Sequence, residues 1–338
     1  MPTFTTVPRN ESVLERFGRY PSAINFGVGT TEVQRNARKH GLYGFEPGTQ
    51  ATLLTLVQVA AERATSRPVE FFDIGAHVGM HSLLISTVYP ADAVHVTAFE
   101  PTPRTAAACR TLAAANCRQI RIERCAISDE DSTAELYISP WESSNSLQEG
   151  FRPAKESVTV RTMRLDTYCA ERSIRPTVIK IDVETYEAHV IAGASDCLRQ
   201  ARPSIVCEIL AGTGKEATEQ MLTALDSAGY RMHRWTREDG WLECTAQEIL
   251  DQVPHHGNDW LFTPDELDDA FRSALARWRA GIAECTSKTT VRARNYPAPY
   301  RPLRDSTADR LSVRLSASPP RLIVRGERSS AARDHAAG

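Results

Sequence analysis

Short apolar runs alternate with amphipathic segments over most of the chain. Leu53, Leu56, Val57 and Ala60 recur at helical spacing, which predicts a helix that ends near the prolyl residue Pro68. Beyond that point, apolar runs typical of buried strands occupy residues 69–74, 94–99, 120–127, 177–181, 204–209, 230–235 and 260–262. Helices are expected between them, near residues 79–88, 104–116, 185–198 and 214–228. This alternation predicts an α/β fold with a mostly parallel sheet and helices on both faces.

The segment between the third and fourth expected strands interrupts the alternation. Residues 134–138 and 158–162 predict an inserted hairpin around a polar loop at residues 141–156. The pattern therefore divides the chain into three expected parts. They are a lead-in segment at residues 1–48, a catalytic α/β domain at 49–264, and a C-terminal helix followed by a basic, disordered tail at 265–338.

The composition is that of a globular protein, with 338 residues of which 41% are hydrophobic and 24% are charged. No run approaches the roughly 18 apolar residues of a membrane span. The first residues lack the apolar stretch of a signal peptide, so we expect a cytoplasmic protein without a membrane partner. The eight cysteines include no Cys-x-x-Cys pair, which favours reduced thiols over zinc ligands or redox pairs.

The formal net charge of -2 is unevenly distributed. Residues 271–338 contain 14 basic and 5 acidic side chains, so the rest of the chain is acidic. An acidic body argues against binding to duplex nucleic acid, which requires a basic surface. We therefore expect the partner to be a small-molecule acceptor substrate.

A glycine-containing loop follows the first strand, with Asp73 at the strand tip and Gly75 and Gly79 in the loop. In a doubly wound sheet such a loop lies beside the ligand. We expect Gly75 to let the backbone approach the ligand and Gly79 to let the next helix pack against the strand. The spacing differs from the Gly-x-Gly-x-x-Gly of dinucleotide sites, and an acid at position 73 would repel a pyrophosphate.

Two acids at successive strand ends indicate a different nucleoside ligand. Asp73 suits a ligand that carries a sulfonium and an amino group, which is S-adenosyl-L-methionine. Glu100 ends the second strand, at the position that takes both ribose hydroxyls. Together the two positions favour adenosylmethionine over a nicotinamide dinucleotide. The alternative is that Asp73 and Glu100 merely cap helices.

Several segments between residues 46 and 263 resemble the FkbM family of S-adenosylmethionine-dependent methyltransferases. They are residues 72–79, 99–101, 126–129, 180–184 with 186–187, 193–194, 202–203 and 258–264. The resemblance implies a Rossmann-like, seven-stranded methyltransferase sheet and methylation of hydroxyls on sugars, polyketides and other secondary metabolites. Thr185 departs from the glycine common in the family, so we expect a differently shaped loop there.

The fourth strand ends in the predicted catalytic residues, Asp182 and Glu184, which share one side if the extended geometry continues. A sugar or alkyl hydroxyl is a poor nucleophile, so a nearby base must take its proton. Three alternatives stay open. Asp182 could contact the cofactor amino group, both acids could hold a divalent cation together with Glu208, or Glu184 could cap the next helix.

The predicted cofactor site gathers residues from the first three strand ends. They are Asp73, Gly75, Ala76, His77, Gly79, Glu100, Ala126, Ser128 and Asp129. Ala126 or Ser128 is expected to flank the adenine ring and Asp129 to bond its amino group, although a simple turn would also explain them.

The remaining candidates are histidines and a loop. His77 is expected to contact cofactor or acceptor, whereas His81 and His189 are expected to have packing roles. Residues 255–256 could reach the pocket mouth, and residues 141–147 could form part of a substrate lid. The histidines lack the three-ligand spacing of a zinc site, so no metal site is predicted.

We therefore expect an enzyme that moves a methyl group from S-adenosyl-L-methionine to a hydroxyl oxygen of a sugar or polyketide-type metabolite. The expected mechanism is in-line displacement with base assistance. N-methylation of a small amine, a nicotinamide-dependent oxidoreductase and a nucleotide-sensing protein without catalysis are the alternatives.

Overall fold

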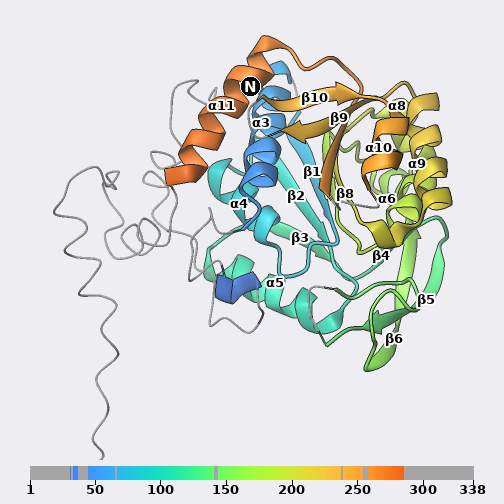
Figure 1. The fold of residues 1–338 in the computed structure, drawn as a ribbon. Coiled ribbons are helices and arrows are strands. Elements are labelled where there is room, and N and C mark those ends of the chain that lie inside the picture. The colour runs from blue at the N-terminus through green and yellow to red at the C-terminus, as the bar shows by residue number, and fades with distance from the viewer. Residues whose placement is uncertain are drawn as a thin grey trace, which may run out of the picture. The chain divides into compact units, whose positions relative to one another are not determined.

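A mixed sheet with a parallel centre organises the computed structural model, which describes residues 31, 33–36, 45–64, 67–140, 144–236, 239–253 and 258–284 (Figure 1). Its strand order is β10-β9-β11-β8-β7-β1-β2-β3. The parallel strands are β1 (Val69–Ile74), β2 (Val94–Phe99), β3 (Ile120–Glu123), β7 (Val178–Ile181) and β8 (Ser204–Ile209). The antiparallel strands are β9 (Arg231–Thr236), β10 (Gly240–Cys244) and β11 (Asn258–Thr263). The predicted α/β fold is confirmed, with eight strands instead of seven because β10 extends the edge as a hairpin with β9.

Helices cover both faces of this sheet (Figure 1). One face carries α3 (Pro47–Arg63), α4 (Met80–Val88), α5 (Pro103–Ala115) and α11 (Asp269–Glu284). The other carries α6 (Leu165–Arg172), α7 (Glu187–Ala192), α8 (Ser195–Gln200), α9 (Lys215–Ser227) and α10 (Ala246–Gln252), with a 3-10 turn at Ala211–Thr213. No described helix is long and apolar enough to cross a membrane.

The predicted inserted hairpin is confirmed and forms a second, smaller sheet. It consists of β4 (Ala126–Ser128), β5 (Ser132–Ile138) and β6 (Glu156–Arg164), in the order β4-β6-β5. The prediction of a single strand at residues 120–127 is therefore wrong. Its first half ends in the main sheet at Glu123, whose carbonyl accepts from the Glu100 N–H at 3.0 Å, and its second half pairs with β6.

The single helix expected at residues 185–198 is likewise two helices, α7 and α8, separated at Gly193. A Cβ on Gly193 would lie 1.9 Å from the Ser128 carbonyl oxygen, so β4 passes too close for any larger residue. Asp166 then accepts hydrogen bonds from the Asp196 and Cys197 N–H groups at 2.8–3.0 Å and caps α8. The hydrophobic pattern could not show either interaction. The elements α6, β10 and α10 were not expected.

The C-terminal helix α11 packs against α3 and shares its core. Leu53 and Val57 on α3 are fully buried, and Phe271, Leu275 and Trp278 on α11 join the same apolar cluster. The Trp278 Nε1 donates to Gln58 Oε1 at 2.8 Å. The expected helix after residue 264 is confirmed, whereas the tail after residue 284 and most of the lead-in segment lie outside the described residues.

The loop after β7 has a left-handed backbone. Glu184 has φ 55° and Thr185 has φ 83°, so the extended geometry does not continue beyond the strand. Bulky and β-branched residues rarely adopt such angles. A fully buried carboxylate, that of Glu187, holds the loop by accepting from the Thr185 N–H and the Thr213 hydroxyl, both at 3.0 Å. Thr185 Oγ1 has no partner among the described residues.

Replacing Trp278 by alanine tests the packing of α11 on α3. The variant removes a large buried side chain and its hydrogen bond to Gln58. We expect the free energy of unfolding, measured in urea, to fall by about 3–5 kcal/mol. The neighbouring exposed variant Arg277→Ala is the control and should change it by less than about 0.5 kcal/mol. Equal stability of the two variants would contradict this packing.

Thr185→Gly tests the strain in the loop after β7. Glycine adopts φ 83° without a steric penalty and removes a buried hydroxyl that lacks a partner. We expect the free energy of unfolding to rise by about 1 kcal/mol, after the entropy cost of glycine is subtracted. Thr185→Ala removes the hydroxyl but keeps the strain, and its gain should be smaller. A lower stability of the glycine variant would show that the loop is unstrained.

Candidate active site

A cleft of about 380 Å³ opens at the carboxyl ends of β1, β2 and β7. This is the edge where parallel α/β sheets bind their ligands, and the volume lies in the range of small-molecule pockets. The predicted site residues that line it are Asp73, Gly75, Ala76, His77, Glu100, Ala126, Asp182 and Glu184. Gly79, Ser128 and Asp129 are described but do not line it.

Asp73 presents an unpaired carboxylate oxygen in a buried position. Its side chain is 1% exposed, and Oδ2 accepts from the Ser82 N–H at 3.0 Å and from the Ser82 hydroxyl at 2.6 Å. Oδ1 has no partner among the described residues. Because a buried carboxylate oxygen without a donor is costly, this atom suits a ligand that brings an N–H donor, such as the amino group of adenosylmethionine.

Glu100 stabilises the loops around the cleft. Its Oε1 accepts from the Thr102 N–H at 2.8 Å and the Thr105 hydroxyl at 2.9 Å, and Oε2 accepts from the His77 N–H at 2.9 Å. Burial raises the pKa of Glu100, although these hydrogen bonds oppose the shift. The carboxylate thus holds the residue that precedes α5, whereas Asp73 caps the first turn of α4 through the Ser82 N–H, as the alternative interpretation expected for that acid. Each carboxylate oxygen can accept two hydrogen bonds, so Oε2 can still bind a ribose hydroxyl.

The two loop glycines are required by close contacts that the sequence did not show. A Cβ on Gly75 would lie 1.7 Å from the backbone oxygen of Asp182, so this glycine lets the β1 loop touch the β7 loop. A Cβ on Gly79 would lie 2.4 Å from Cys109 Sγ on α5. The absence of a side chain at position 79 therefore lets α5, and not the strand, pack closely against the loop. Both glycines have positive φ, 80° and 76°. The contact between Gly75 and Asp182 fixes the loop after β1 against the loop after β7.

The predicted adenine contacts are only partly brought to the cleft. Ala126 lines it, but Ser128 donates to Asp129 at 2.9 Å, and Asp129 pairs with His189 Nδ1 at 3.0 Å. The His189 ring stacks on Tyr186 with centroids 4.0 Å apart. Tyr186, which lines the cleft, was not among the predicted residues. Tyr186 belongs to the segment at residues 186–187 that resembles the family, so it could have been selected from the sequence.

Lys180 is a buried cation beside the predicted catalytic acids. Its Nζ lies 2.6 Å from Asp182 Oδ2, and its side chain is 3% exposed. Burial alone would lower the pKa of Lys180, but the carboxylates of Asp182, Glu46, Asp73 and Asp259 raise it above its ordinary value. For Asp182, burial is likewise opposed by Lys180, whose charge lowers the pKa of the acid. The pair is therefore ionised at neutral pH.

Three carboxylates converge next to this pair. Oxygen atoms of Asp182, Glu184 and Glu208 lie within 4.8 Å of one another. Burial, followed by repulsion from Asp182, raises the pKa of Glu184 to about 8 and that of Glu208 to about 10. Such a set of oxygen atoms could hold a divalent cation. Lys180 already neutralises one of the three acids, and protons retained on the other two reduce the remaining repulsion.

Phe45 and Glu46 line the cleft from a segment that sequence patterns did not select. Glu46 Oε2 lies 3.0 Å from His81 Nε2, and the Phe45 ring lies 5.4 Å from the His81 ring. His81 is therefore packed, as expected. No local motif marks Glu46 as part of the site, because its partners come from α4 and β7. Lys180, in contrast, could have been selected from the sequence, because a lysine inside an apolar strand needs a counter-ion.

The expected lid is described only in part, because residues 141–143 lie outside the described residues. The histidines at 255–256, which were expected near the pocket mouth, also lie outside them. Asn145 and Leu147 line the cleft. The hydroxyl of Ser146 donates to the Glu184 carbonyl oxygen at 2.6 Å. This loop therefore contacts the backbone that carries one of the predicted catalytic acids.

Comparison with known proteins gives matches over the same region of the chain. Residues 73–232 match the sequence model described as Methyltransferase FkbM domain. A curated relative, 31-O-demethyl-FK506 methyltransferase FkbM from Streptomyces tacrolimicus, is 29% identical over 171 residues. That match covers 41% of this chain and 64% of the relative, so the chain spans less than two thirds of the relative's length.

Comparison with solved structures also finds methyltransferases, at low TM-scores. Methyltransferase FkbM from Methylobacillus flagellatus KT has a TM-score of 0.37 and 15% identity over 62% of this chain and 47% of its own. An O-methyltransferase from Bacillus cereus in complex with SAH has a TM-score of 0.37 and 11% identity over 76% of this chain and 92% of its own. The family resemblance inferred from the motifs is supported by the sequence matches, because residues 73–232 of this chain match the FkbM methyltransferase domain.

Proposed function

We propose that this methyltransferase uses S-adenosyl-L-methionine to methylate a hydroxyl oxygen of a small molecule, a sugar or a polyketide-type metabolite. The observation that carries the proposal is the arrangement of acids along the cleft. Asp73 offers an unpaired oxygen at one strand end, and the Asp182–Glu184–Glu208 carboxylates lie at the neighbouring strand ends. The name of the curated relative, which specifies an O-demethyl compound, also supports an oxygen acceptor.

The residues of the cleft divide into two groups with separate tasks. Asp73 and Glu100 are placed to hold the amino group and the ribose of the cofactor. When bound, adenosylmethionine supplies a methyl group on a positively charged sulfur, which an oxygen nucleophile displaces in line. The Gly75–Asp182 contact fixes the loop after β1 against the loop after β7. That contact keeps the acceptor and cofactor positions in register, and such positioning is worth roughly 7–11 kcal/mol.

Glu184 is the proposed general base. Asp182 is bound to Lys180 at 2.6 Å, so its proton affinity is low. Glu184 has a pKa of about 8, which lies close to a neutral working pH, where a general base is most effective. In its ionised form the Glu184 carboxylate accepts the hydroxyl proton as the new oxygen–carbon bond forms. Asp182 and Lys180 are positioning residues that set the charge around it.

Titration with S-adenosylhomocysteine by calorimetry tests the cofactor. The unmodified chain should bind it, and Asp73→Asn should weaken binding by roughly ten- to a hundredfold, because a charge-assisted hydrogen bond is lost. Asp92→Asn, an exposed acid-to-amide change, is the matched control and should bind normally. Binding of NADH with no binding of S-adenosylhomocysteine would replace this proposal by the nicotinamide alternative.

The pH profile of kcat/KM tests the base. Because Glu184 acts as a carboxylate and its pKa is raised to about 8, kcat/KM should rise as the pH increases through about 8. Glu184→Gln should abolish this rise and lower turnover by about 10²–10⁴-fold while retaining S-adenosylhomocysteine binding.

The exposed variant Glu216→Gln serves as the control for the pH profile and should keep it unchanged. Asp182→Asn should also lose turnover, because its partner Lys180 is left without its closest counter-ion. If Glu184→Gln and Asp182→Asn both keep the full rate, neither acid assists the reaction.

A further inference from the structure

A second cavity of about 300 Å³ meets the cleft at Glu46, which lines both. Its other walls include Arg234, Trp235, Trp241, Gln252 and Asp259. We propose that this second cavity binds the acceptor, and that the part bound there is a neutral ring carrying several hydroxyl groups. The inference rests on the proposed methyl transfer and names the acceptor site for it.

The position of the second cavity places it on the acceptor side of the sheet. Asp259 lies on β11 directly opposite Glu208 on β8. Glu208 belongs to the carboxylate cluster that contains the proposed base, Glu184. A molecule between Trp235 and Asp259 therefore lies one strand away from Glu208, and the shared Glu46 wall connects it with the cleft that Glu184 lines. Cofactor and acceptor would occupy adjoining cavities that share the Glu46 wall.

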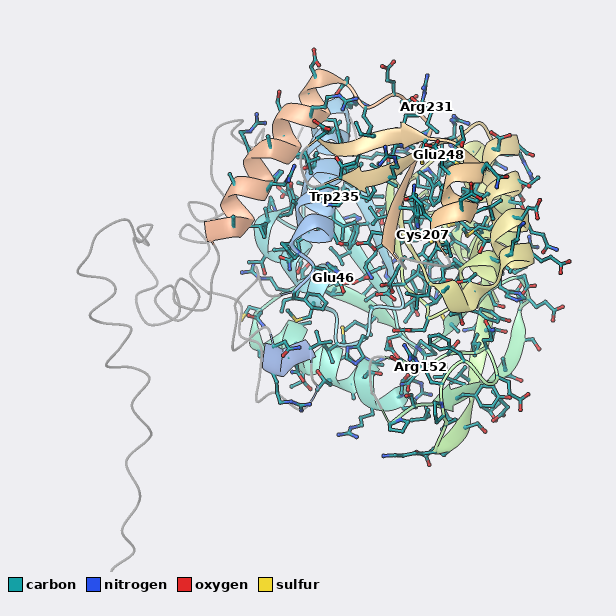
Figure 2. All side chains as sticks on the ribbon, in the orientation of Figure 1. Glu46, Arg152, Cys207, Arg231, Trp235 and Glu248 are labelled. Atoms are coloured by element: carbon teal, nitrogen blue, oxygen red, sulfur yellow. The ribbon has the colours of Figure 1, made fainter. Side chains whose placement is uncertain are left out.

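Aromatic rings form one wall of the second cavity. Trp235 and Trp241 meet edge to face with centroids 5.1 Å apart, and Trp235 is labelled in Figure 2 together with Glu46. Trp241 is 2% exposed, and its N–H is bonded to the Thr52 hydroxyl at 2.8 Å. The indole of Trp235 is only partly buried and lies against Gly48, where an added Cβ would come within 3.4 Å of the ring. An indole with exposed apolar area suits the C–H face of a saturated ring.

Hydrogen-bonding groups form the opposite wall. The carboxylate of Asp259 accepts from the Thr49 hydroxyl, and that of Glu46, 40% exposed, faces His81. Each carboxylate can accept further hydrogen bonds, and hydroxyl groups are the matching donors. Arg234 and Gln252 add donors for hydroxyl oxygens. A ring with several hydroxyls therefore satisfies both the aromatic and the polar wall.

Existing cations around the cavity argue for a neutral occupant. Lys180 already interacts with both Glu46 and Asp259, whose charges raise its pKa. The guanidinium of Arg279 lies over the Trp235 ring at 5.0 Å, so a cation already occupies one face of that indole. Arg234 adds a further positive charge to the wall. These three cations offset the charges of the Glu46 and Asp259 carboxylates, which favours a hydroxylated ring over an ammonium acceptor.

Binding of simple ring probes tests the inference without turnover. The full chain, saturated with S-adenosylhomocysteine, is titrated with methyl β-D-glucopyranoside, methyl α-L-rhamnopyranoside, cyclohexane-1,2-diol and, as a cationic probe, tyramine. Tryptophan fluorescence and calorimetry report binding. We expect at least one hydroxylated ring to bind saturably and to change the fluorescence, because three tryptophans line the cavity. Tyramine should not bind.

Two variants locate the probe in the second cavity. Asp259→Asn and Trp235→Leu should each weaken its binding by roughly tenfold or more, measured by calorimetry. Trp235→Leu, which lies outside the carboxylate cluster, should leave the affinity for S-adenosylhomocysteine unchanged. Asp226→Asn, an exposed acid on α9, is the matched control and should bind the probe normally.

The inference is overturned if no hydroxylated ring binds, if tyramine binds instead, or if either cavity variant leaves the probe affinity unchanged. Failure of the proposed function has a separate signature, because the unmodified chain would then not bind S-adenosylhomocysteine. A chain that binds S-adenosylhomocysteine but no hydroxylated ring therefore rejects only the acceptor site.

Discussion

The ammonium group of Lys180 is the interaction on which the candidate site depends. It is 3% exposed and is surrounded by the carboxylates of Asp182, Glu46, Asp73 and Asp259. A buried charge is strongly unfavourable unless opposite charges compensate it, and the same holds for each acid. Because the acids raise its pKa, Lys180 stays protonated and cannot act as a base. Its role is to let several carboxylates share one edge of the sheet.

One cation cannot neutralise all the acids at this edge, and burial followed by repulsion from Asp182 keeps protons on two of them. Glu184 and Glu208 retain protons to a higher pH than isolated carboxyls, with pKa values of about 8 and about 10. Asp182, the acid bonded to the ammonium, stays ionised, whereas Glu184 and Glu208 hold protons. A group ready to exchange a proton near neutral pH thus arises from burial beside a charged carboxylate, in the way that active sites commonly tune their acids and bases.

Much of the fold could be predicted because its central strands are continuous apolar runs. β1, β2 and β8 begin and end at the predicted residues, since buried parallel strands leave a strong pattern. The break at Gly193 and the split after Glu123 depend on backbone contacts with distant strands, so local patterns missed them. The edge hairpin of β10 was missed as well, because its alternation is short.

The acids of the site were predictable because each lies at or just beyond the end of a parallel strand. Asp73, Glu100, Asp182 and Glu184 meet this condition, and all four line the cleft. Glu46 does not, because its contact with His81 spans 35 positions and is created by the packing of α3 on the sheet. The contacts that exclude a side chain at Gly75 and Gly79 were also missed, since those atoms belong to Asp182 and Cys109, far away in the sequence.

The pairing of α3 with α11 has a consequence for folding during synthesis. The hydrogen bond between Gln58 and Trp278 joins residues 220 positions apart, and β11 enters between β8 and β9 only near the end of that interval. A ribosome adding about 5–20 residues per second needs roughly 10–45 s to make this stretch. During that time the apolar side of α3 has no partner helix, so the nascent chain must keep it from aggregating until α11 emerges.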